Sequence, residues 1–217
     1  GRITPSAIVM VATVRALKYH GGVDLADLSK PDVEAVKRGL ANLDRHLENS
    51  RVFGVSTVVA VNKFSADTDD EVKAVIDHCE KHGFKAFAAD YWAEGGKGGL
   101  ELAEEVVKQV DDSESHFKPV YELRESGENK IEAVAKKSYG AEEVEFTNPA
   151  LSDLRLIQKL KLDRLPVCIA KTQSSFSDDP KRRGRPEGFT IQVRQIEIAA
   201  GAGFLIPITG KIMRMPG

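Results

Sequence analysis

The sequence is poor in cysteine and tryptophan and has no long apolar segment. Cys79 and Cys168 are the only two cysteines in 217 residues, and no C-x-x-C spacing joins them. This scarcity predicts reduced thiols in a cytoplasmic protein, with a single Cys79–Cys168 disulfide as the open alternative. Apolar runs such as residues 7–14 are far shorter than the roughly 20 residues of a membrane helix, so we expect no membrane partner.

An excess of charge of either sign is also missing. Lys and Arg total 31, Asp and Glu total 33, and the formal net charge is −2. Such a balance offers no global electrostatic reason to expect nucleic acid as a partner. No segment matches the phosphate-binding pattern G-x-x-x-x-G-K-[ST] either.

The first half of the chain alternates between predicted strands and predicted helices. Continuous β-branched or apolar runs predict buried strands at residues 7–14, 56–61 and 85–89. Apolar side chains at helical spacing predict helices at residues 33–47, 69–82 and 99–110. This order predicts an α/β fold with three layers, a mostly parallel sheet flanked by helices.

The second half is less regular. We expect helices at residues 120–139, with a break near Gly127, and from Asn148 to about Leu162. Later strands are expected at residues 166–170, 190–198 and 203–208. Residues 178–188, DDPKRRGRPEG, read as a polar loop with four basic side chains, for which a solvated loop is preferred over a phosphate contact.

Ligands of open parallel sheets bind beyond the carboxyl ends of the strands. Four polar or aromatic segments follow predicted strands there: residues 15–22, 62–64, 90–99 and 171–177. Phe64 and Trp92 follow neighbouring strands, so a flat heterocycle could lie between their rings, with each ring contact contributing about 0.5–1.5 kcal/mol. A role as core plugs is the open alternative for both rings.

Four glycines in five residues follow Trp92, at positions 95, 96, 98 and 99. Glycines allow a ligand to approach the backbone closely and can present N–H donors ahead of a helix. Loops of this composition also serve as plain turns. The two interpretations stay equally open.

Two further patterns are weaker. His78 and His82 have the i, i+4 spacing of a helical zinc pair, but no third ligand is evident, so we expect a solvated helix end and no metal site. Asn62 and Lys63 match the start of the guanine-reading N-K-x-D pattern of GTPases. Ser65 stands where that pattern needs its aspartate, which argues against a GTPase-like fragment.

The stretch VATVRALKYHGG at residues 11–22 closely resembles a signature of formate–tetrahydrofolate ligases, also called 10-formyltetrahydrofolate synthetases. Further blocks that resemble the family lie in the same order, at residues 39–43, 59–62, 92–98, 170–172, 201–204 and 215–217. The resemblance therefore extends over essentially the whole chain.

The resemblance implies an enzyme that forms 10-formyltetrahydrofolate from formate, tetrahydrofolate and ATP with Mg²⁺, through formyl phosphate. It implies that Phe64 and Trp92 sandwich the pterin ring, with possible backbone contacts from Gly95 and Gly96. Arg15 and His20 become candidates at the active-site cleft, without an assigned role. An ion pair that closes a domain interface is an equal alternative for Arg15.

Family members are longer and carry their phosphate loop upstream of the matching part. The resemblance therefore implies a C-terminal portion, with the end of a P-loop NTPase-like nucleotide-binding domain at residues 1–50 and a folate-binding α/β domain at residues 51–217. By itself such a piece is expected to be inactive, although the parent enzyme is expected to form a homotetramer. A standalone folate-binding or assembly module without catalysis is the alternative.

One block departs from the family pattern. Many relatives have Pro-Thr-Gly-Phe beside the nucleotide, whereas this chain has Pro186, Glu187, Gly188 and Phe189. A carboxylate near ATP phosphates is unfavourable. We therefore expect that Glu187 points away from the nucleotide or that the local nucleotide contact differs.

Overall fold

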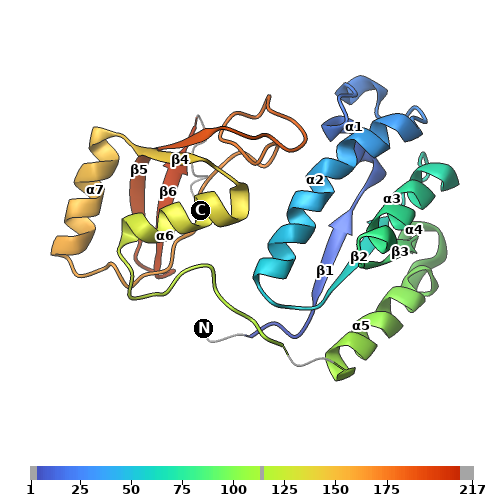
Figure 1. Ribbon diagram of the computed structural model, residues 1–217, viewed down its shortest axis with the longest axis horizontal. Helices are drawn as coiled ribbons and strands as arrows, with labels where there is room; N and C mark the ends of the chain where they lie inside the picture. The colour runs from blue at the N-terminus through green and yellow to red at the C-terminus, as the bar shows by residue number, and fades with distance from the viewer. Residues whose placement is uncertain (1–3, 113–114, 211–217) are drawn as a thin grey trace. The chain divides into compact units, whose positions relative to one another are not determined.

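The computed structural model describes residues 4–112 and 115–210, and the chain divides into two compact units, Gly1–Lys118 and Pro119–Gly217 (Figure 1). The domain boundary expected at residue 50 falls inside the first unit. The reason is strand pairing: β1 (Ile8–Ala12), from before that position, pairs in parallel with β2 (Thr57–Asn62), from after it. The motif at residues 215–217 lies outside the described residues.

The first unit contains a parallel sheet of three strands in the order β1-β2-β3, where β3 is Lys85–Ala89. All three strands predicted for this half are present, and the parallel arrangement is confirmed. The central strand β2 is buried along nearly its whole length. A strand buried on both faces explains its run of valines, because no position faces water.

Helices cover both faces of this sheet. Val59 and Val61 on β2 belong to one core together with residues of α1 (Val14–His20), α2 (Val33–Val52) and α3 (Asp69–Lys81). Val58 and Ala60, which alternate with them, pack toward Leu102 of α5 (Leu100–Asp112). The first unit is therefore a three-layer α/β structure, as predicted.

The polar segment after β1, for which no helix was predicted, is a helix. Thr13 has an extended backbone, and its Oγ1 accepts a hydrogen bond from the N–H of Ala16 at 3.1 Å, which makes it the N-cap of α1. Threonine favours this position because it satisfies an otherwise unpaired backbone donor. β1 consequently ends at Ala12, two residues earlier than the apolar run predicts.

Glycines allow α1 and α2 to pack with their backbones in contact. A Cβ atom added to Gly39 of α2 would overlap the carbonyl oxygen of Leu17 in α1. A Cβ on Gly21, which follows α1, would overlap the carbonyl oxygen of Ala35. Gly21 and Gly39 therefore have a structural reason to be glycine, because a side chain at either position would force the helices apart.

Short helical turns fill the rest of the first unit. A 3₁₀ turn, η1, spans Leu25–Asp27 ahead of α2. The segment after β3 contains α4 (Tyr91–Glu94) and a second 3₁₀ turn, η2 (Gly95–Gly99). Thr68 caps α3 in a capping box with Glu71, in which each side chain bonds the other's backbone N–H.

The second unit holds a mixed three-stranded sheet in the order β4-β5-β6. β4 (Glu143–Phe146) runs parallel to β5 (Thr190–Ala199), and β5 runs antiparallel to β6 (Phe204–Thr209). The two late strands were predicted, whereas β4 was not, because Glu143 and Glu145 make it polar at alternate positions. The strand expected at residues 166–170 is reduced to isolated bridges, Val167 to Leu205 and Ala170 to Ile208.

The first helix of the second unit begins later than expected. α6 (Gly127–Ala133) continues into a π-helical turn, η3 (Val134–Tyr139), so residues 120–126 are not helical. Ser126 is the N-cap of α6, which explains why the helix starts beside Gly127. α7 (Asn148–Lys159) starts at its expected place, with Thr147 as N-cap and Pro149 in the first turn.

Candidate functional site

The carboxyl ends of β2 and β3 bring two aromatic segments to the same edge of the sheet. Asn62 pairs with Ala89, and the N–H of Lys63 donates to the carbonyl oxygen of Ala89 at 3.1 Å. Phe64 and Trp92 follow these two strand ends within three residues. The structure thus places both residues at the edge where ligands of parallel sheets bind.

A carboxylate anchors each aromatic segment. Asp67 Oδ2 accepts a hydrogen bond from the N–H of Phe64 at 2.9 Å. Asp90 Oδ1 accepts one from the N–H of Ala93 at 3.1 Å and so caps α4, which carries Trp92. The backbone around each ring is therefore held in place by a local side chain.

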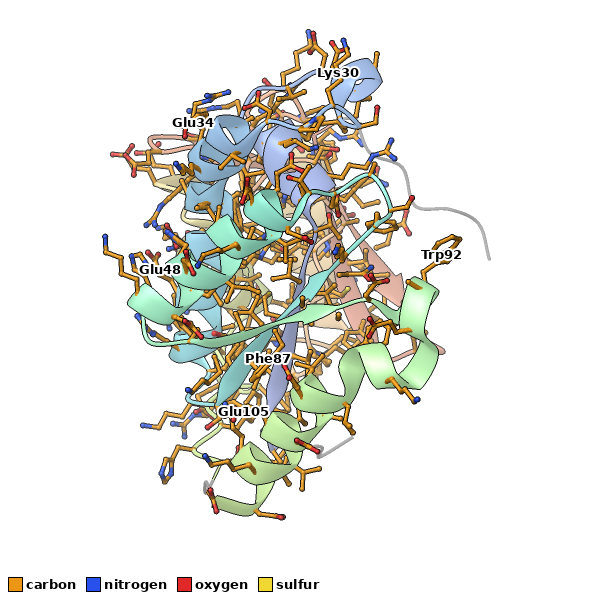
Figure 2. All side chains as sticks on the ribbon, turned by 90° about the vertical axis from the view of Figure 1, so that its right-hand side faces the viewer. Lys30, Glu34, Glu48, Phe87, Trp92 and Glu105 are labelled. Atoms are coloured by element: carbon orange, nitrogen blue, oxygen red, sulfur yellow. The ribbon has the colours of Figure 1, made fainter. Side chains whose placement is uncertain are left out.

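Both rings are exposed rather than buried as core plugs. Phe64 is 50% exposed and Trp92 is 86% exposed, and Figure 2 shows Trp92 standing away from the ribbon. A tryptophan that contacts so little of its own protein loses the favourable burial of a large apolar surface. Its ring face is free to stack on a flat ligand.

The same edge carries more negative than positive charge. Lys63 Nζ lies 2.8 Å from Asp69 Oδ1. The hydrogen bond to Asp69, with the charges of Asp90 and Asp67 nearby, raises the pKa of Lys63. With Lys63 bound to Asp69, the interpretation of Asn62 and Lys63 as a guanine-reading pair finds no support in the geometry.

The glycine cluster after Trp92 divides into three kinds of position. A Cβ on Gly98 would overlap the carbonyl oxygen of Asp90, and one on Gly99 would overlap the ring of Tyr91. Gly95 has a φ of +57°, which other residues rarely adopt. Only Gly96 has open space around its Cβ position and no unusual φ, so the structure gives no internal reason for glycine there.

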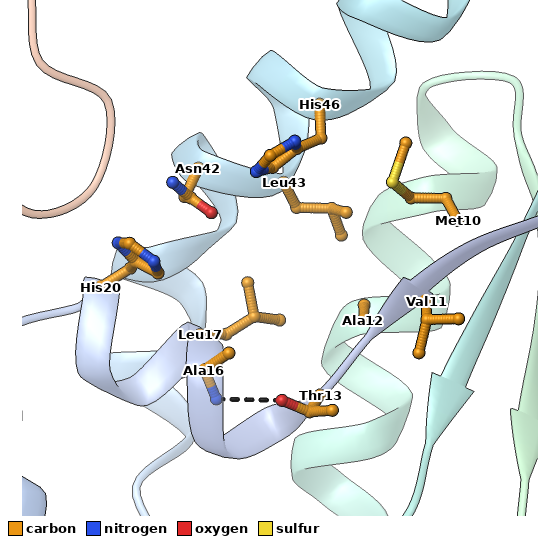
Figure 3. Close-up of a pocket in the computed structure, with 10 residues that line it drawn as sticks. All are labelled: Met10, Val11, Ala12, Thr13, Ala16, Leu17, His20, Asn42, Leu43 and His46. Carbon is orange, nitrogen blue, oxygen red and sulfur yellow. Dashed lines mark hydrogen bonds between the residues drawn. The ribbon is translucent and has the colours of Figure 1, made fainter. Parts of the chain in front are cut away.

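His20 lines a pocket between β1, α1 and α2 (Figure 3). The cavity has a volume of about 240 Å³, and Thr13, Asn42 and His46 also contribute polar atoms to its wall. This volume lies below the roughly 300–1,000 Å³ of typical small-molecule sites. Arg15 is exposed on α1 and is not part of the lining.

Glu187 and Gly188 lie in the second unit. Glu187 is exposed, and its backbone carbonyl accepts a hydrogen bond from Arg182 Nη2 at 2.8 Å. Gly188 has a φ of +58°, which explains glycine at this position without a ligand. Arg182 also lies over the ring of Phe189, 5.6 Å from its centroid, so one arginine organises this turn.

A partly buried lysine was not singled out from the sequence. Lys171, in the block at residues 170–172, donates to the carbonyl oxygens of Thr172 at 2.9 Å, Ser177 at 3.3 Å and Ser175. Burial lowers the pKa of Lys171 to about 8, although the charge of Asp178 acts in the opposite direction. Local sequence could not reveal this environment, because the carbonyl groups come from the loop that folds back around the lysine.

Among the residues that the structure describes, none of the helices combines the length and the apolar character needed to span a membrane. Both cysteines are free thiols, Cys79 buried and Cys168 exposed, as expected from their spacing.

The fold and the aromatic edge define an α/β protein with a candidate ligand site at the carboxyl ends of parallel strands. The chain belongs to the formate–tetrahydrofolate ligase family, because the sequence model of that family matches residues 1–217. It is 50% identical over 217 residues to a formate–tetrahydrofolate ligase of Bacillus licheniformis. The match covers 100% of this chain and 39% of that relative, so the chain spans well under half of the relative's length.

Proposed function

We propose that this chain is the pterin-binding part of a formate–tetrahydrofolate ligase. The observation that carries the proposal is the pair of exposed rings, Phe64 and Trp92, at the carboxyl ends of two adjacent parallel strands. Membership of the ligase family supplies the ligand, because tetrahydrofolate contains a flat pterin of a size that two aromatic rings can enclose.

The carboxylates at this edge suit the polar rim of a pterin. Its amino group and ring N–H are hydrogen-bond donors, and carboxylate oxygens accept such bonds strongly. Asp67 uses Oδ2 and Asp90 uses Oδ1 to anchor the aromatic segments, which leaves the other oxygen of each carboxylate as a candidate acceptor. Gly96, open on its Cβ side, allows a ligand to approach the backbone.

The reaction proposed for the whole enzyme joins formate to N10 of tetrahydrofolate, and ATP is cleaved to ADP and phosphate. Phosphorylation turns formate into formyl phosphate; the N10 amine then attacks the formyl carbon, and phosphate leaves with the electrons of the broken C–O bond. Holding the pterin fixes the position of N10 and so favours this attack. The present chain binds the pterin. Binding of ATP and Mg²⁺ is proposed for the whole enzyme, with Glu187 and Gly188 near the nucleotide.

Arg15 and His20 remain candidates for the cleft of the whole enzyme. Arg15 is exposed and available for such a contact, and His20 lines the small pocket beside it. We also propose a cytoplasmic homotetramer for the whole enzyme. The division into a nucleotide-binding end before residue 50 and a folate-binding part after it is retained as a functional proposal only.

The test is the fluorescence of Trp92, the single tryptophan of the chain. Tetrahydrofolate is titrated into the 217-residue protein, with correction for its absorbance. Saturable quenching is expected, because a stacked pterin contacts the indole directly. The Phe64→Ala variant is expected to bind about 2- to 13-fold more weakly, which corresponds to the loss of one ring contact of about 0.5–1.5 kcal/mol.

Phe204→Ala is the matched control, because Phe204 is also a partly exposed phenylalanine, 38% accessible, but lies in the second unit. It is expected to leave the quenching curve unchanged. Absence of saturable quenching in folded protein, or equal affinity of the Phe64→Ala variant, would contradict the proposal. Quenching by GTP instead of tetrahydrofolate would favour the GTPase-like alternative.

A standalone folate-binding module is separated from the ligase part by complementation. If the chain is part of a ligase, adding the remainder of a related ligase lacking this region is expected to restore ATP-dependent formation of 10-formyltetrahydrofolate. Pterin binding with no restored activity would favour the module without catalysis.

A further inference from the structure

Two imidazoles and one carboxylate meet at the end of α3 that is remote from the aromatic edge. His78 lies in the last turn of α3 and His82 is its C-cap residue, whereas Asp44 comes from α2. One potential ligand atom of each side chain lies within 4.8 Å of the other two. We propose that Asp44, His78 and His82 form a binding site for a divalent transition-metal ion such as Zn²⁺.

Asp44 supplies the third ligand that the sequence spacing of the two histidines lacks. His78 Nε2 lies 2.6 Å from Asp44 Oδ1, across 34 residues of sequence. The two imidazole rings lie together as well, with centroids 4.3 Å apart and an angle of 36° between their planes. The helix–helix contact of α2 with α3 thus completes a set of ligand types that zinc prefers.

The hydrogen bond of His82 leaves one ring nitrogen ready to bind an ion. Its Nδ1 lies 2.8 Å from the carbonyl oxygen of His78. A carbonyl oxygen only accepts, so Nδ1 carries the proton and Nε2 of the neutral ring keeps its lone pair. A backbone carbonyl that fixes the second nitrogen in this way is the usual support of a metal-binding histidine.

The close pair of Asp44 and His78 needs only a small adjustment. An ion bound tetrahedrally at about 2.0–2.1 Å from each atom would hold the nitrogen and oxygen about 3.3 Å apart. The side chains of His78 and Asp44 are 20% and 28% exposed, so they can move apart and water can complete the coordination. When the ion binds His78 Nε2, the proton that this nitrogen donates to the carboxylate moves through solvent to His78 Nδ1, so the imidazole stays neutral.

The neighbouring groups define what the site accepts. One carboxylate and two neutral imidazoles carry a total charge of −1. A bound divalent cation would therefore leave the site with a net charge of only +1. Arg51 donates from Nη2 to the carbonyl oxygen of His82 at 2.6 Å, and its guanidinium stacks on Phe84, 4.4 Å from the ring centroid. This positive charge opposes a cation but also holds the helix end in place.

Cys79 does not add a thiolate ligand. It is fully buried in the first unit, and burial raises the pKa of its thiol to about 12, with the charge of Asp44 contributing. Imidazole with one carboxylate favours zinc, cobalt or nickel over calcium and magnesium, which prefer oxygen ligands alone. The site therefore differs in chemistry from any Mg²⁺ that accompanies ATP.

The position of the site separates it from the proposed pterin site. α3 begins after the carboxyl end of β2 and ends before the start of β3, so its two ends lie at opposite edges of the sheet. Its 13 residues span roughly 20 Å. A bound ion would join the C-terminal end of α3 to the middle of α2 and stabilise the first unit without touching the aromatic edge.

The test is Zn²⁺ binding to tag-free protein by isothermal titration calorimetry, with Co²⁺ absorption as a second probe of the coordination. One equivalent of Zn²⁺ is expected to bind. His82→Gln and Asp44→Asn are expected to weaken binding at least about tenfold. Both variants should fold, because His82 is exposed and Asp44→Asn preserves the shape and a hydrogen bond to His78; their thermal unfolding without metal checks this.

His116→Gln is the matched control, since His116 is an exposed histidine of the same unit outside the cluster. It is expected to bind Zn²⁺ as the original chain does. In long-range ¹H–¹⁵N spectra, Zn²⁺ is expected to shift the Nε2 resonance of His82 and leave its Nδ1 protonated. No saturable Zn²⁺ binding, binding that survives His82→Gln and Asp44→Asn, or binding that His116→Gln abolishes would overturn the proposal.

Discussion

Lys18 and Glu71 form an ion pair in the interior of the first unit, with Nζ and Oε1 3.0 Å apart and both side chains fully buried. The pair joins α1 to the first turn of α3. Lys18 also donates to the carbonyl oxygen of Lys30, and Glu71 Oε1 accepts from the N–H of Asp32 at 2.8 Å. The two side chains therefore connect three segments, namely α1, α3 and the loop at residues 30–32. Each charged group depends on the other for its neutralisation.

Removal of one partner is expected to destabilise the protein strongly. Lys18→Met leaves the Glu71 carboxylate buried without its cation, which typically costs about 3–5 kcal/mol. The double variant Lys18→Met with Glu71→Gln removes both charges and is expected to recover part of that loss. Urea unfolding measures the stability of the original chain and of the two variants, and equal stability of the single and double variants would contradict this account.

Glu71 also predicts a loss of stability in acid. Burial by itself would raise its pKa, but hydrogen bonds from the N–H groups of Thr68 and Asp32 and from Lys18 together lower the pKa below its ordinary value. In the unfolded chain the carboxyl of Glu71 titrates at about pH 4.3. The contribution of Glu71 to the free energy of unfolding is therefore complete above that pH, and it is lost as the pH falls through the lower folded-state pKa. Between pH 5 and 3, the original chain is expected to lose more stability than Glu71→Gln, as measured by urea unfolding at each pH.

The contact between α1 and α2 predicts that Gly39 tolerates no side chain. Gly39→Ala forces its Cβ against the carbonyl oxygen of Leu17, and overpacking of this kind costs about 1–3 kcal/mol. Gly201→Ala is the control, because the Cβ position of Gly201 is open. Thermal unfolding should distinguish them, and an unchanged melting temperature for Gly39→Ala would show that the helices can separate without cost.

The two cysteines are expected to differ in reactivity. Cys168 is exposed, whereas Cys79 is buried and its thiol pKa is raised to about 12. A thiol reagent needs the thiolate, so the native protein should release one equivalent of thionitrobenzoate at pH 8 and two after unfolding. Cys168→Ser is expected to abolish the native reaction. Two rapid equivalents from native protein would show that the core around Cys79 opens.

Lys171 predicts a change of stability at alkaline pH. Its folded-state pKa of about 8 lies below the unfolded value of about 10.4, so the unfolded chain binds more protons between these two values. Stability contributed by Lys171 therefore rises as the pH increases from 8 to about 10. Urea unfolding at both ends of this range should show a smaller rise in Lys171→Met, whereas the matched variant of the exposed Lys97, Lys97→Met, should follow the original chain.

Local patterns were sufficient for much of the fold. Residues 85–89 form the strand predicted for them, and α7 starts at Asn148 as the Pro149 signal indicates. The alternating polar residues of β4 concealed that strand from sequence patterns, and α1, which begins at a threonine cap, was not predicted. Those two outcomes depend on a neighbouring strand and on the geometry of one turn, which propensity alone does not report.

The sequence by itself determined the parallel α/β order, the family and the two aromatic residues that follow adjacent strands. Each of these depends only on local spacing and residue type. Only the tertiary structure brought Asp44 to His78 and Lys18 to Glu71. These partners are far apart in the chain, and their meeting depends on how α1, α2 and α3 pack over one face of the sheet. Packing of that kind is set by the combined shape of many side chains, so no single segment contains the information.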